Sequence, residues 1–397
     1  MDEITTLLTR GVDAIYPNRE ELEKVLRSGK KLKLYQGFDP TGTELHIGHM
    51  VGLRKLAQFQ KLGHEVIFLI GDFTAMVGDP SGKTTARQML TKEEVAKNAD
   101  EYIKQAGRIL DFDGNNPIKI LYNSDWLTKV NTIELIRISS NLSVQQVIER
   151  DLFQNRFKEG NDVYMNEFFY PVMQAYDSVY MDVDLEIGGR DQMFNMMMGR
   201  KLMRNMKKKD KFVMTTPLLE DSEGRKIGKT EGNVIALVDS PNDLFGKIMA
   251  LGDDVIVKGL EFLTDVPDGE IKEIEYKIKA GENPIQFKKK LAFEIVKQLD
   301  TEENASFAQK TFESTIQNKE APTEITELTV KEGQSIVDVL VESGMVVSKS
   351  DAKRLLEQGG VEIDGKKLDL GYSMLDIRNG QIIKVGKHKF LKLKLKT

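Results

Sequence analysis

The chain of 397 residues contains no cysteine, which excludes disulfide bonds, cysteine-ligated zinc and catalysis by a thiol. It has no run of about eighteen apolar residues, so we expect no membrane-spanning helix and no membrane partner. Its first residues lack the basic and apolar regions of a secretory leader and the Arg- and Ser-rich composition of a transit peptide. These absences predict a cytoplasmic protein.

The length and composition of the chain predict two or three folded domains. The chain is 40% hydrophobic and 30% charged, and its length exceeds that of one ordinary domain. The net charge is −5, so any surface for nucleic acid has to be local. Residues 331–397 meet that condition, because they carry 13 Lys and Arg against 9 Asp and Glu, whereas the remainder of the chain has a net charge of −9.

The N-terminal part of the chain has the pattern of a parallel α/β sheet. The run Leu32–Phe38 predicts a buried strand, and apolar residues at helical spacing predict a helix from Ile47 to Leu62. His64–Gly71 is almost continuously apolar, as expected for a parallel strand that is covered on both faces. Strand, helix and strand at this spacing form a βαβ unit. Further strands are predicted at Asp182–Ile187 and Lys211–Met214.

Changes of pattern along the chain predict four segments. Residues 1–225 form the α/β domain, and residues 226–320 form a basic loop followed by helices, one of which begins at the N-cap Ser240. Residues 321–334 have little apolar periodicity and are predicted to be a linker. Residues 335–397 form a small α+β unit in which two helices precede strands and turns.

Two of the four histidines lie in His46-Ile47-Gly48-His49, at the start of a predicted helix. At positions i and i+3 the two rings face the same way, where backbone N–H groups and the helix dipole favour an anion. Gly48 removes a side chain, so a flat ring such as adenine can approach the backbone. The alternative interpretation is a pair of ordinary surface histidines.

A second candidate motif, Arg225–Thr230, carries Lys226 and Lys229 three residues apart with a glycine between them. Two flexible cations suit the neutralisation of a departing pyrophosphate as its charge develops. Alone, such a loop is also typical of a solvated charged surface. The two motifs together, in this order, favour a site for ATP. No G-x-x-x-x-G-K-[ST] sequence occurs, so P-loop binding is excluded.

This pair of motifs resembles the HIGH and KMSKS motifs of class I aminoacyl-tRNA synthetases. The resemblance implies that ATP is a substrate, that Mg²⁺ arrives with it, and that the protein holds no metal of its own. The substrate carboxylate is already ionised, so the reaction needs alignment and charge neutralisation rather than a general base. The resemblance also implies which residues take part in catalysis. They come from both motifs, from the turn before the first motif, and from a loop at Lys83 and Arg87 that resembles the family's mobile loop: Thr41, His46, His49, Lys83, Arg87, Lys226, Lys229 and Thr230.

A polar stripe lies between the two motifs. Tyr170, Gln174 and Asp177 occur at i, i+4 and i+7, on one face of a helix that is otherwise apolar. Such polar groups are expected to face a ligand; the alternative is the wet side of an ordinary amphipathic helix. Further candidates at strand ends or in the loops that follow, where open α/β sheets bind ligands, are Tyr35, Asp79 and Gln192.

The motifs Tyr35–Thr41, Val77–Lys83, Gln174–Asp177 and Ile187–Gln192 resemble the tyrosyl-tRNA synthetase family, and the resemblance covers most of the chain. It implies an L-tyrosine site made of Tyr35, Asp79, Tyr170, Gln174, Asp177 and Gln192, with Tyr35 and Asp177 at the phenol. It implies an ATP site made of Gly37, Asp39, His46, Gly48, His49, Asp191, Lys226 and Lys229. Phenylalanine would be rejected because two buried polar groups would stay unpaired, an effect for which this family is the usual example.

The same resemblance assigns a fold to each segment. It implies a Rossmann-like catalytic domain with a parallel sheet, an α-helical domain that faces the anticodon, and a small α+β S4-like RNA-binding domain. It also implies transfer of tyrosine to tRNA(Tyr) and a homodimer. The RNA-binding candidates are cations on a short helix and the following hairpin: Lys349, Lys353, Arg354 and Lys366. Taken alone, such a basic face is often merely solvated. The run Lys387–Lys396 is predicted to be a basic edge strand.

Pro171 departs from the usual family pattern and is expected to kink or restart the helix that carries the polar stripe. Three alternatives to the tyrosyl enzyme share part of this pattern. A tryptophanyl-tRNA synthetase shares both ATP motifs, but Tyr35 and Asp177 suit a phenol rather than an indole. A non-catalytic RNA-binding protein is expected to have damaged ATP motifs, and a simple nucleotidylyltransferase would not need an S4-like segment.

Overall fold

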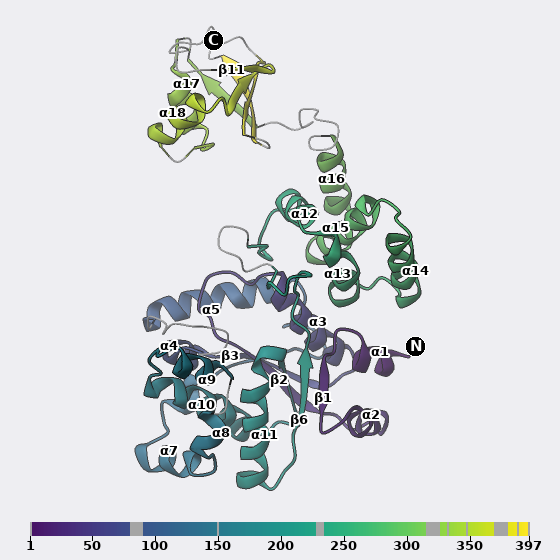
Figure 1. The fold of residues 1–397 in the computed structure, drawn as a ribbon, viewed down its shortest axis with the longest axis vertical. Helices are drawn as coiled ribbons and strands as arrows, with labels where there is room; N and C mark the ends of the chain where they lie inside the picture. The colour runs from purple at the N-terminus through teal and green to yellow at the C-terminus, as the bar shows by residue number, and fades with distance from the viewer. Residues whose placement is uncertain are drawn as a thin grey trace. The chain divides into compact units, whose positions relative to one another are not determined.

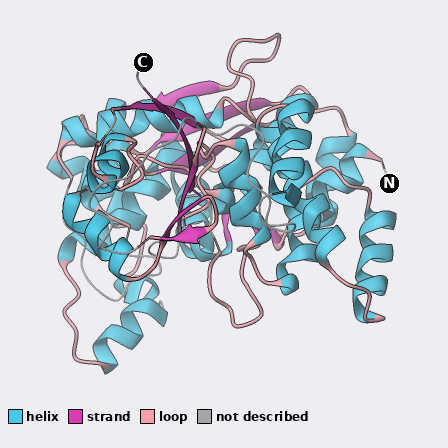
Figure 2. Cartoon of the chain, turned by 90° about the horizontal axis from the view of Figure 1, so that it is seen from above, coloured by secondary structure: helices cyan, strands magenta, loops and turns pink. Residues whose placement is uncertain are grey.

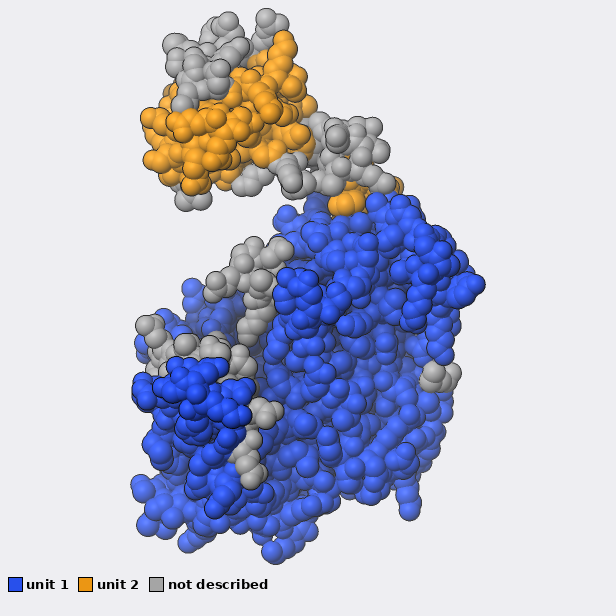
Figure 3. Space-filling view, in the orientation of Figure 1, with its two compact units in different colours: residues 1–305 blue, residues 306–397 orange. Residues whose placement is uncertain are grey.

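The computed structural model describes residues 2–79, 90–148, 151–227, 234–314, 326–331, 333–346, 348–368, 380–386 and 389–395. The chain divides into two compact units, residues 1–305 and residues 306–397 (Figure 3). Helices form the greater part of the regular structure (Figure 2).

The first unit is built on a six-stranded sheet with the order β1-β6-β5-β2-β3-β4. Neighbouring strands are parallel, except that β1 runs antiparallel to β6. The strands are β1 (Ala14–Tyr16), β2 (Lys33–Phe38), β3 (Glu65–Ile70), β4 (Lys119–Tyr122), β5 (Leu185–Gly189) and β6 (Phe212–Thr216). β3 is buried over all but its first residue, as a parallel strand covered on both faces requires. The predicted α/β fold with a mostly parallel sheet is confirmed.

Helices connect these strands (Figure 1). Those before residue 226 are α1 (Glu3–Thr9), α2 (Arg19–Arg27), α3 (Ile47–Lys61), α4 (Asp72–Val77), α5 (Lys92–Ala106), α6 (Ser124–Leu127), α7 (Thr132–Ser139), α8 (Val144–Ile148), α9 (Asp151–Lys158), α10 (Met165–Met181), the 3₁₀ turn η1 (Arg190–Gln192) and α11 (Met193–Lys207). The helical region that follows contains α12 (Pro241–Met249), η2 (Asp253–Val255), α13 (Ile256–Leu263), α14 (Asp268–Lys279), α15 (Ile285–Leu299) and α16 (Glu302–Phe312).

The helix that carries the polar stripe does not restart at its proline. α10 continues through Pro171 as one helix of 17 residues. Its first turn is fixed independently of the missing proline N–H, because Glu167 accepts from the backbone N–H of Tyr164 at 3.0 Å and forms a buried ion pair with Arg156. This anchoring explains how the helix tolerates a proline near its beginning.

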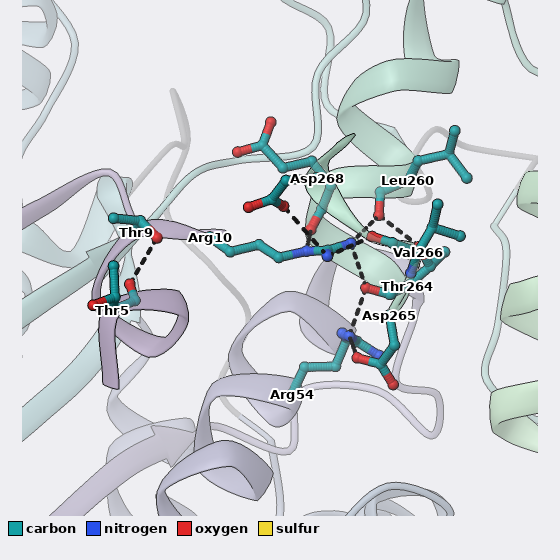
Figure 4. Close-up of polar contacts among 10 residues, drawn as sticks. Thr5, Thr9, Arg10, Arg54, Leu260, Thr264, Asp265, Val266 and Asp268 are labelled. Atoms are coloured by element: carbon teal, nitrogen blue, oxygen red, sulfur yellow. Dashed lines mark hydrogen bonds and ion pairs between the residues drawn. The ribbon is translucent and has the colours of Figure 1, made fainter. Parts of the chain in front are cut away.

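Two arginines join the helical region to the N-terminal segment (Figure 4). Arg10 forms an ion pair with Asp268 at 3.5 Å, and Arg54 donates to the carbonyl oxygen of Thr264 at 2.8 Å and pairs with Asp265 at 2.5 Å. The Arg10 guanidinium also donates, at 2.6 to 2.8 Å, to the carbonyl oxygens of Leu260, Glu261, Thr264 and Val266. Carbonyls at a helix C-terminus lack intrahelical partners, so Arg10 caps the end of α13.

Lys55, beside these arginines, provides a test of stability against pH. Its ammonium is buried and donates to neutral acceptors, the carbonyl of Leu7 at 2.7 Å and Gln58 Oε1 at 2.9 Å. Burial, together with Arg54 and Arg10, lowers the pKa of Lys55 from 10.5 to about 7. Above pH 7 the unfolded chain therefore binds more protons at this lysine than the folded chain does, and stability rises with pH until the unfolded lysine also deprotonates.

We expect this contribution to add about 2 kcal/mol to the free energy of unfolding between pH 7 and pH 9. Lys55→Met should remove that rise, measured by urea denaturation at both pH values. Lys61→Met is the matched control, because Lys61 lies on the same helix but is exposed and paired with Glu3. An unchanged rise in Lys55→Met would contradict the assignment.

The second unit is a five-stranded sheet, order β7-β11-β10-β8-β9, with two helices that share its apolar core. Its elements are β7 (Thr326–Val330), α17 (Ile336–Glu342), α18 (Lys349–Glu357), β8 (Val361–Ile363), β9 (Lys366–Lys367), β10 (Ile382–Val385) and β11 (Lys389–Leu395). Asp364 and Gly365 form the turn between β8 and β9 with positive φ angles of 46° and 79°, as a two-residue hairpin turn requires.

The prediction that the closing basic strand lies at a sheet edge is wrong. β11 pairs with β10 on one side and runs parallel to β7 on the other. β7 comes from residues 326–330, within the segment predicted to be a linker. Five residues, Thr-Glu-Leu-Thr-Val, are too few to show a periodicity, and their pairing partners lie about 65 residues further along the chain.

Candidate functional site

The polar residues predicted to bind a substrate come from the strand β2, the turns after β2, α4 and β5, and the helix α10. Tyr170 on α10 donates its hydroxyl hydrogen to Asp39 Oδ2 at 2.9 Å. Gln192 in η1, directly after β5, donates to Asp79 Oδ2 at 2.8 Å. The first pair joins α10 to the turn that follows β2, and the second joins the turn after α4 to the end of β5. The fold therefore gathers residues that are up to 131 positions apart.

Asp177 on α10 is 2% exposed, and its carboxylate is held by two donors. Trp126 Nε1 donates to Oδ1 at 2.8 Å and Asn123 Nδ2 donates to Oδ2 at 3.2 Å. Burial raises the pKa of Asp177 well above its usual value, and the two hydrogen bonds oppose that rise. Both donors were missed in the sequence, although Trp126 is its only tryptophan and Asn123 directly follows the strand β4.

Tyr35 on β2 is fully buried beside this carboxylate. Its hydroxyl lies 2.8 Å from Ser178 Oγ, one residue after Asp177 on α10. Burial raises the pKa of Tyr35 well above 10, and the charges of Glu186 and Asp177 add to the effect. Tyr35 is therefore a neutral phenol that can donate or accept a hydrogen bond.

Gln174, one turn before Asp177 on α10, has only one end of its amide paired. Its Nε2 donates to Glu186 Oε1 at 3.2 Å. Its Oε1 is buried and has no hydrogen-bond partner among the described residues. A buried acceptor without a partner is uncommon in native structures and indicates a place for a donor. Ser178, Glu186 and a further buried neighbour, Lys211, were not identified from the sequence; a glutamate within the buried strand β5 was the available signal.

The two histidines cap the beginning of α3. His46 Nδ1 accepts from the backbone N–H of Gly48 at 3.1 Å, and His49 Nδ1 accepts from the backbone N–H of His46 at 3.1 Å. Since both Nδ1 atoms accept, each neutral ring carries its hydrogen on Nε2 and can donate from there. The ring centroids are 3.9 Å apart. A Cβ at Gly48 would lie 3.0 Å from the His46 ring, so any larger residue here would require that ring to move.

The segment that follows the lysine motif is attached to the histidine motif through backbone hydrogen bonds. Ile47 N donates to Ile235 O at 2.9 Å, and Leu237 N donates to Leu45 O at 2.8 Å. Lys226 Nζ lies 2.8 Å from Asp191 Oδ2. The structure therefore places the segment after the lysine motif against the histidine motif, and the backbone of Ile227 also lies near Gly48, where an added Cβ would be 3.9 Å from the Ile227 carbonyl oxygen. Four predicted residues lie outside the described part of the chain: Lys83, Arg87, Lys229 and Thr230.

The remaining ATP candidates lie in or after the end of β2. Gly37 is exposed, and a Cβ added there would meet only Leu69, at 3.8 Å. Thr41 N donates to Asp39 O at 2.8 Å, which closes the turn between β2 and α3. Because Gly37 has no side chain, the surface at the end of β2 stays accessible.

The four basic candidates of the second unit are all exposed. Lys349 forms an ion pair with Asp338 at 2.7 Å, and Arg354 pairs with Asp351 at 2.8 Å. Lys353 is on the same helix as both, and Lys366 lies on β9. The cations are therefore available at the surface of this unit, two of them next to a carboxylate.

Three other features of the described residues bear on function. No group of three or more His, Asp or Glu among them could hold a metal ion. None of the described helices is long and apolar enough to cross a membrane. A cavity of about 560 Å³ lies between α1, α3 and the turn at Asp265, and none of the predicted site residues lines it.

Comparison with known proteins identifies relatives over the whole chain. Residues 27–317 match the family of class I tRNA synthetases (W and Y), and residues 334–373 match the S4 domain. A tyrosine–tRNA ligase of Thermotoga maritima is 42% identical over 99% of this chain and 97% of its own length. A tyrosine–tRNA ligase of Haemophilus influenzae is 40% identical over 100% of this chain and 98% of its own length.

Solved structures agree in fold. A C-terminally truncated mitochondrial tyrosyl-tRNA synthetase of Coccidioides posadasii matches 78% of this chain and 91% of its own, with a TM-score of 0.63 and 25% identity. A tyrosyl-tRNA synthetase of Archaeoglobus fulgidus, solved with L-tyrosine, matches 78% of this chain with a TM-score of 0.60 and 23% identity. With full-length relatives at about 40% identity, this chain belongs to the tyrosine–tRNA ligase family of class I synthetases.

Proposed function

We propose that this protein activates L-tyrosine with ATP, forming tyrosyl-adenylate and pyrophosphate, and transfers the tyrosine to the 3′-terminal adenosine of tRNA(Tyr). The observation that supports it best is that a buried phenol and a buried carboxylate, Tyr35 and Asp177, lie beside the Gln174 amide oxygen, which has no hydrogen-bond partner in the described part of the chain. Such a set matches a ring hydroxyl and an ammonium.

Recognition of the ring would depend on Asp177 and Tyr35. Asp177 accepts the hydrogen of the substrate phenol while Tyr35 donates to its oxygen. Trp126 and Asn123 hold the carboxylate in place for this contact. Phenylalanine lacks the hydroxyl, so both buried groups would lose a partner, and this loss opposes its binding.

The substrate ammonium and carboxylate would be held by the second group of residues. The ammonium donates to Gln174 Oε1 and is surrounded by Tyr170 and Asp79. Gln192 lies near the substrate carboxylate. The bond between Gln192 and Asp79 supports this arrangement, because it sets the two side chains next to each other. The substrate carboxylate then faces the α-phosphate of ATP.

The reaction itself is a displacement at phosphorus. A carboxylate oxygen of tyrosine attacks the α-phosphorus, the bond to the bridging oxygen breaks, and pyrophosphate leaves. His46 and His49 donate from Nε2 to phosphate oxygens, with Thr41 beside them, and Lys226 adds a positive charge. Gly37, Asp39, Gly48 and Asp191 line the nucleotide, and Lys83, Arg87, Lys229 and Thr230 contribute from the two loops. Mg²⁺ enters with ATP, bound to its phosphates.

For tRNA we propose a catalytic domain over residues 1–225, a loop and anticodon-facing helices over 226–320, and an RNA-binding domain that consists of residues 335–397 together with β7, the strand found within the predicted linker 321–334. Phosphates of the tRNA would contact Lys349, Lys353, Arg354 and Lys366. The match of residues 334–373 to the S4 domain supports the last assignment.

We also propose a cytoplasmic homodimer. Seven of the eleven large apolar side chains that are exposed among the described residues belong to one stretch of the chain, from α7 to the end of α10. They are Ile133, Ile136, Val144, Phe157, Tyr164, Met165 and Tyr180. Exposed apolar side chains gathered in one part of a chain favour contact with a partner.

A test of the proposed function is amino-acid-dependent exchange of pyrophosphate into ATP, measured with each of the twenty amino acids. We expect exchange with tyrosine, with phenylalanine and tryptophan lower by several powers of ten. Exchange that is strongest with tryptophan would favour a tryptophanyl-tRNA synthetase, and exchange with no amino acid would overturn the proposal. Charging of tRNA(Tyr) by the same preparation tests the second step.

A further inference from the structure

A lysine and a glutamate form a fully buried ion pair beneath the substrate residues. Lys211, just before β6, is 0% exposed, and Glu186 on the neighbouring strand β5 is 2% exposed. α11 leaves room for the pair by a glycine: a Cβ at Gly199 would lie 2.7 Å from Lys211 Nζ and 3.3 Å from Glu186 Oε2. Replacing a buried ion pair by apolar residues is often neutral or stabilising, so stability alone does not explain this pair.

The glutamate determines which end of Gln174 faces the substrate. An ionised carboxylate only accepts hydrogen bonds, and Glu186 Oε2 accepts one from Lys211 Nζ. Gln174 must therefore present its Nε2 to Glu186 Oε1, at 3.2 Å. Its Oε1 is consequently turned away, as the buried acceptor without a partner among the described residues. An acceptor in that place suits an ammonium and repels a carboxylate.

The lysine limits the hydrogen bonds that Ser178 makes beside Tyr35. Lys211 Nζ donates to Ser178 Oγ at 2.8 Å, and because an ammonium cannot accept, the hydrogen of Ser178 goes elsewhere. Ser178 donates to Glu186 Oε2 at 3.3 Å, and its 2.8 Å contact with Tyr35 Oη can run in either direction. When the substrate oxygen takes the hydrogen of Tyr35, Ser178 can turn its own hydrogen to Tyr35 Oη.

We propose that Lys211 and Glu186 are positioning residues that orient Gln174 and, through Ser178, hold the hydrogen-bond partner of Tyr35. One buried ion pair thereby couples recognition of the ring hydroxyl to recognition of the ammonium. This inference rests on the proposed function, since it concerns how the same site orients its groups toward tyrosine.

The coupling is tested with two variants of the full-length protein. The double variant Lys211→Met/Glu186→Gln removes both charges with little change of shape, and a glutamine at 186 can face Gln174 with either end. Ser178→Ala removes only the link to Tyr35. Pyrophosphate exchange gives kcat and KM for tyrosine, phenylalanine and ATP in each case.

We expect the double variant to raise KM for both amino acids by about tenfold, because both carry the ammonium, and to lower the tyrosine-to-phenylalanine ratio of kcat/KM by about tenfold. Ser178→Ala should lower that ratio while KM for phenylalanine stays within about twofold, since Gln174 keeps its orientation. KM for ATP should change little in either variant.

Arg200→Met is the matched control. Arg200 follows Gly199 on α11 and is itself buried, but it pairs with Asp210 rather than with the substrate residues. We expect it to lower stability and to leave the ratio unchanged. A wild-type ratio in the double variant and in Ser178→Ala would overturn the proposal, and so would an equal loss of ratio in Arg200→Met. Absence of tyrosine-dependent exchange in the wild type would instead sink the proposed function, and this inference with it.

Discussion

Asp177→Ala should lower kcat/KM for tyrosine activation by about 10³-fold or more. The carboxylate is the acceptor proposed for the phenol hydrogen, and it also accepts from Trp126 and Asn123. Its removal leaves the substrate hydroxyl and both protein donors unpaired in a buried place, which is the situation in which lost hydrogen bonds cost most. The measurement is tyrosine-dependent pyrophosphate exchange.

The control for this variant is Glu167→Ala on the same helix. Glu167 is also a buried carboxylate, but its partner is Arg156 and it contacts none of the substrate residues predicted from the sequence. Both variants lose a buried acid and should lose stability, whereas only Asp177→Ala should lose activity toward tyrosine. Near-normal activation of tyrosine by folded Asp177→Ala would show that the phenol is recognised elsewhere.

The residues of the polar stripe were found from the sequence because they follow one helix. Tyr170, Gln174 and Asp177 repeat with the period of α10, so a local pattern was enough. The groups that hold them were missed because they come from other elements. Trp126 is 51 positions from Asp177, and Lys211 is 33 positions from Ser178. No local pattern records such contacts, and Lys211 follows Lys207, Lys208 and Lys209, a charged run that is typical of a solvated end.

The strands and helices that were predicted differ in the same way from those that were not. β2, α3 and β3 were placed to within about two residues, because each has a strong local pattern and the three are consecutive. β1 was missed because it has only three residues and pairs antiparallel with β6, some 200 residues away. β7 was missed for a similar reason, and its absence from the prediction made β11 look like an edge.

Lys226→Ala should lower kcat for adenylate formation by about 10²-fold while KM for tyrosine changes less than about twofold. Lys226 pairs with Asp191 at 2.8 Å. Asp191 is one of the residues proposed to line the nucleotide, so nucleotide binding would give this carboxylate a new partner and release the lysine for the phosphates. A cation that reaches the phosphates in this way acts on charge that develops in the transition state.

Arg225→Ala is the control for the loss of a positive charge at the same place. Arg225 precedes Lys226 directly, is more exposed, and pairs with Asp221 at 2.7 Å rather than with a nucleotide-binding candidate. If the effect were a general one of surface charge, both variants would slow the reaction equally. If Lys226 assisted only the binding of ground-state substrates, its loss would raise KM and leave kcat unchanged. Only a fall of kcat confined to Lys226→Ala agrees with a role of this lysine in the transition state.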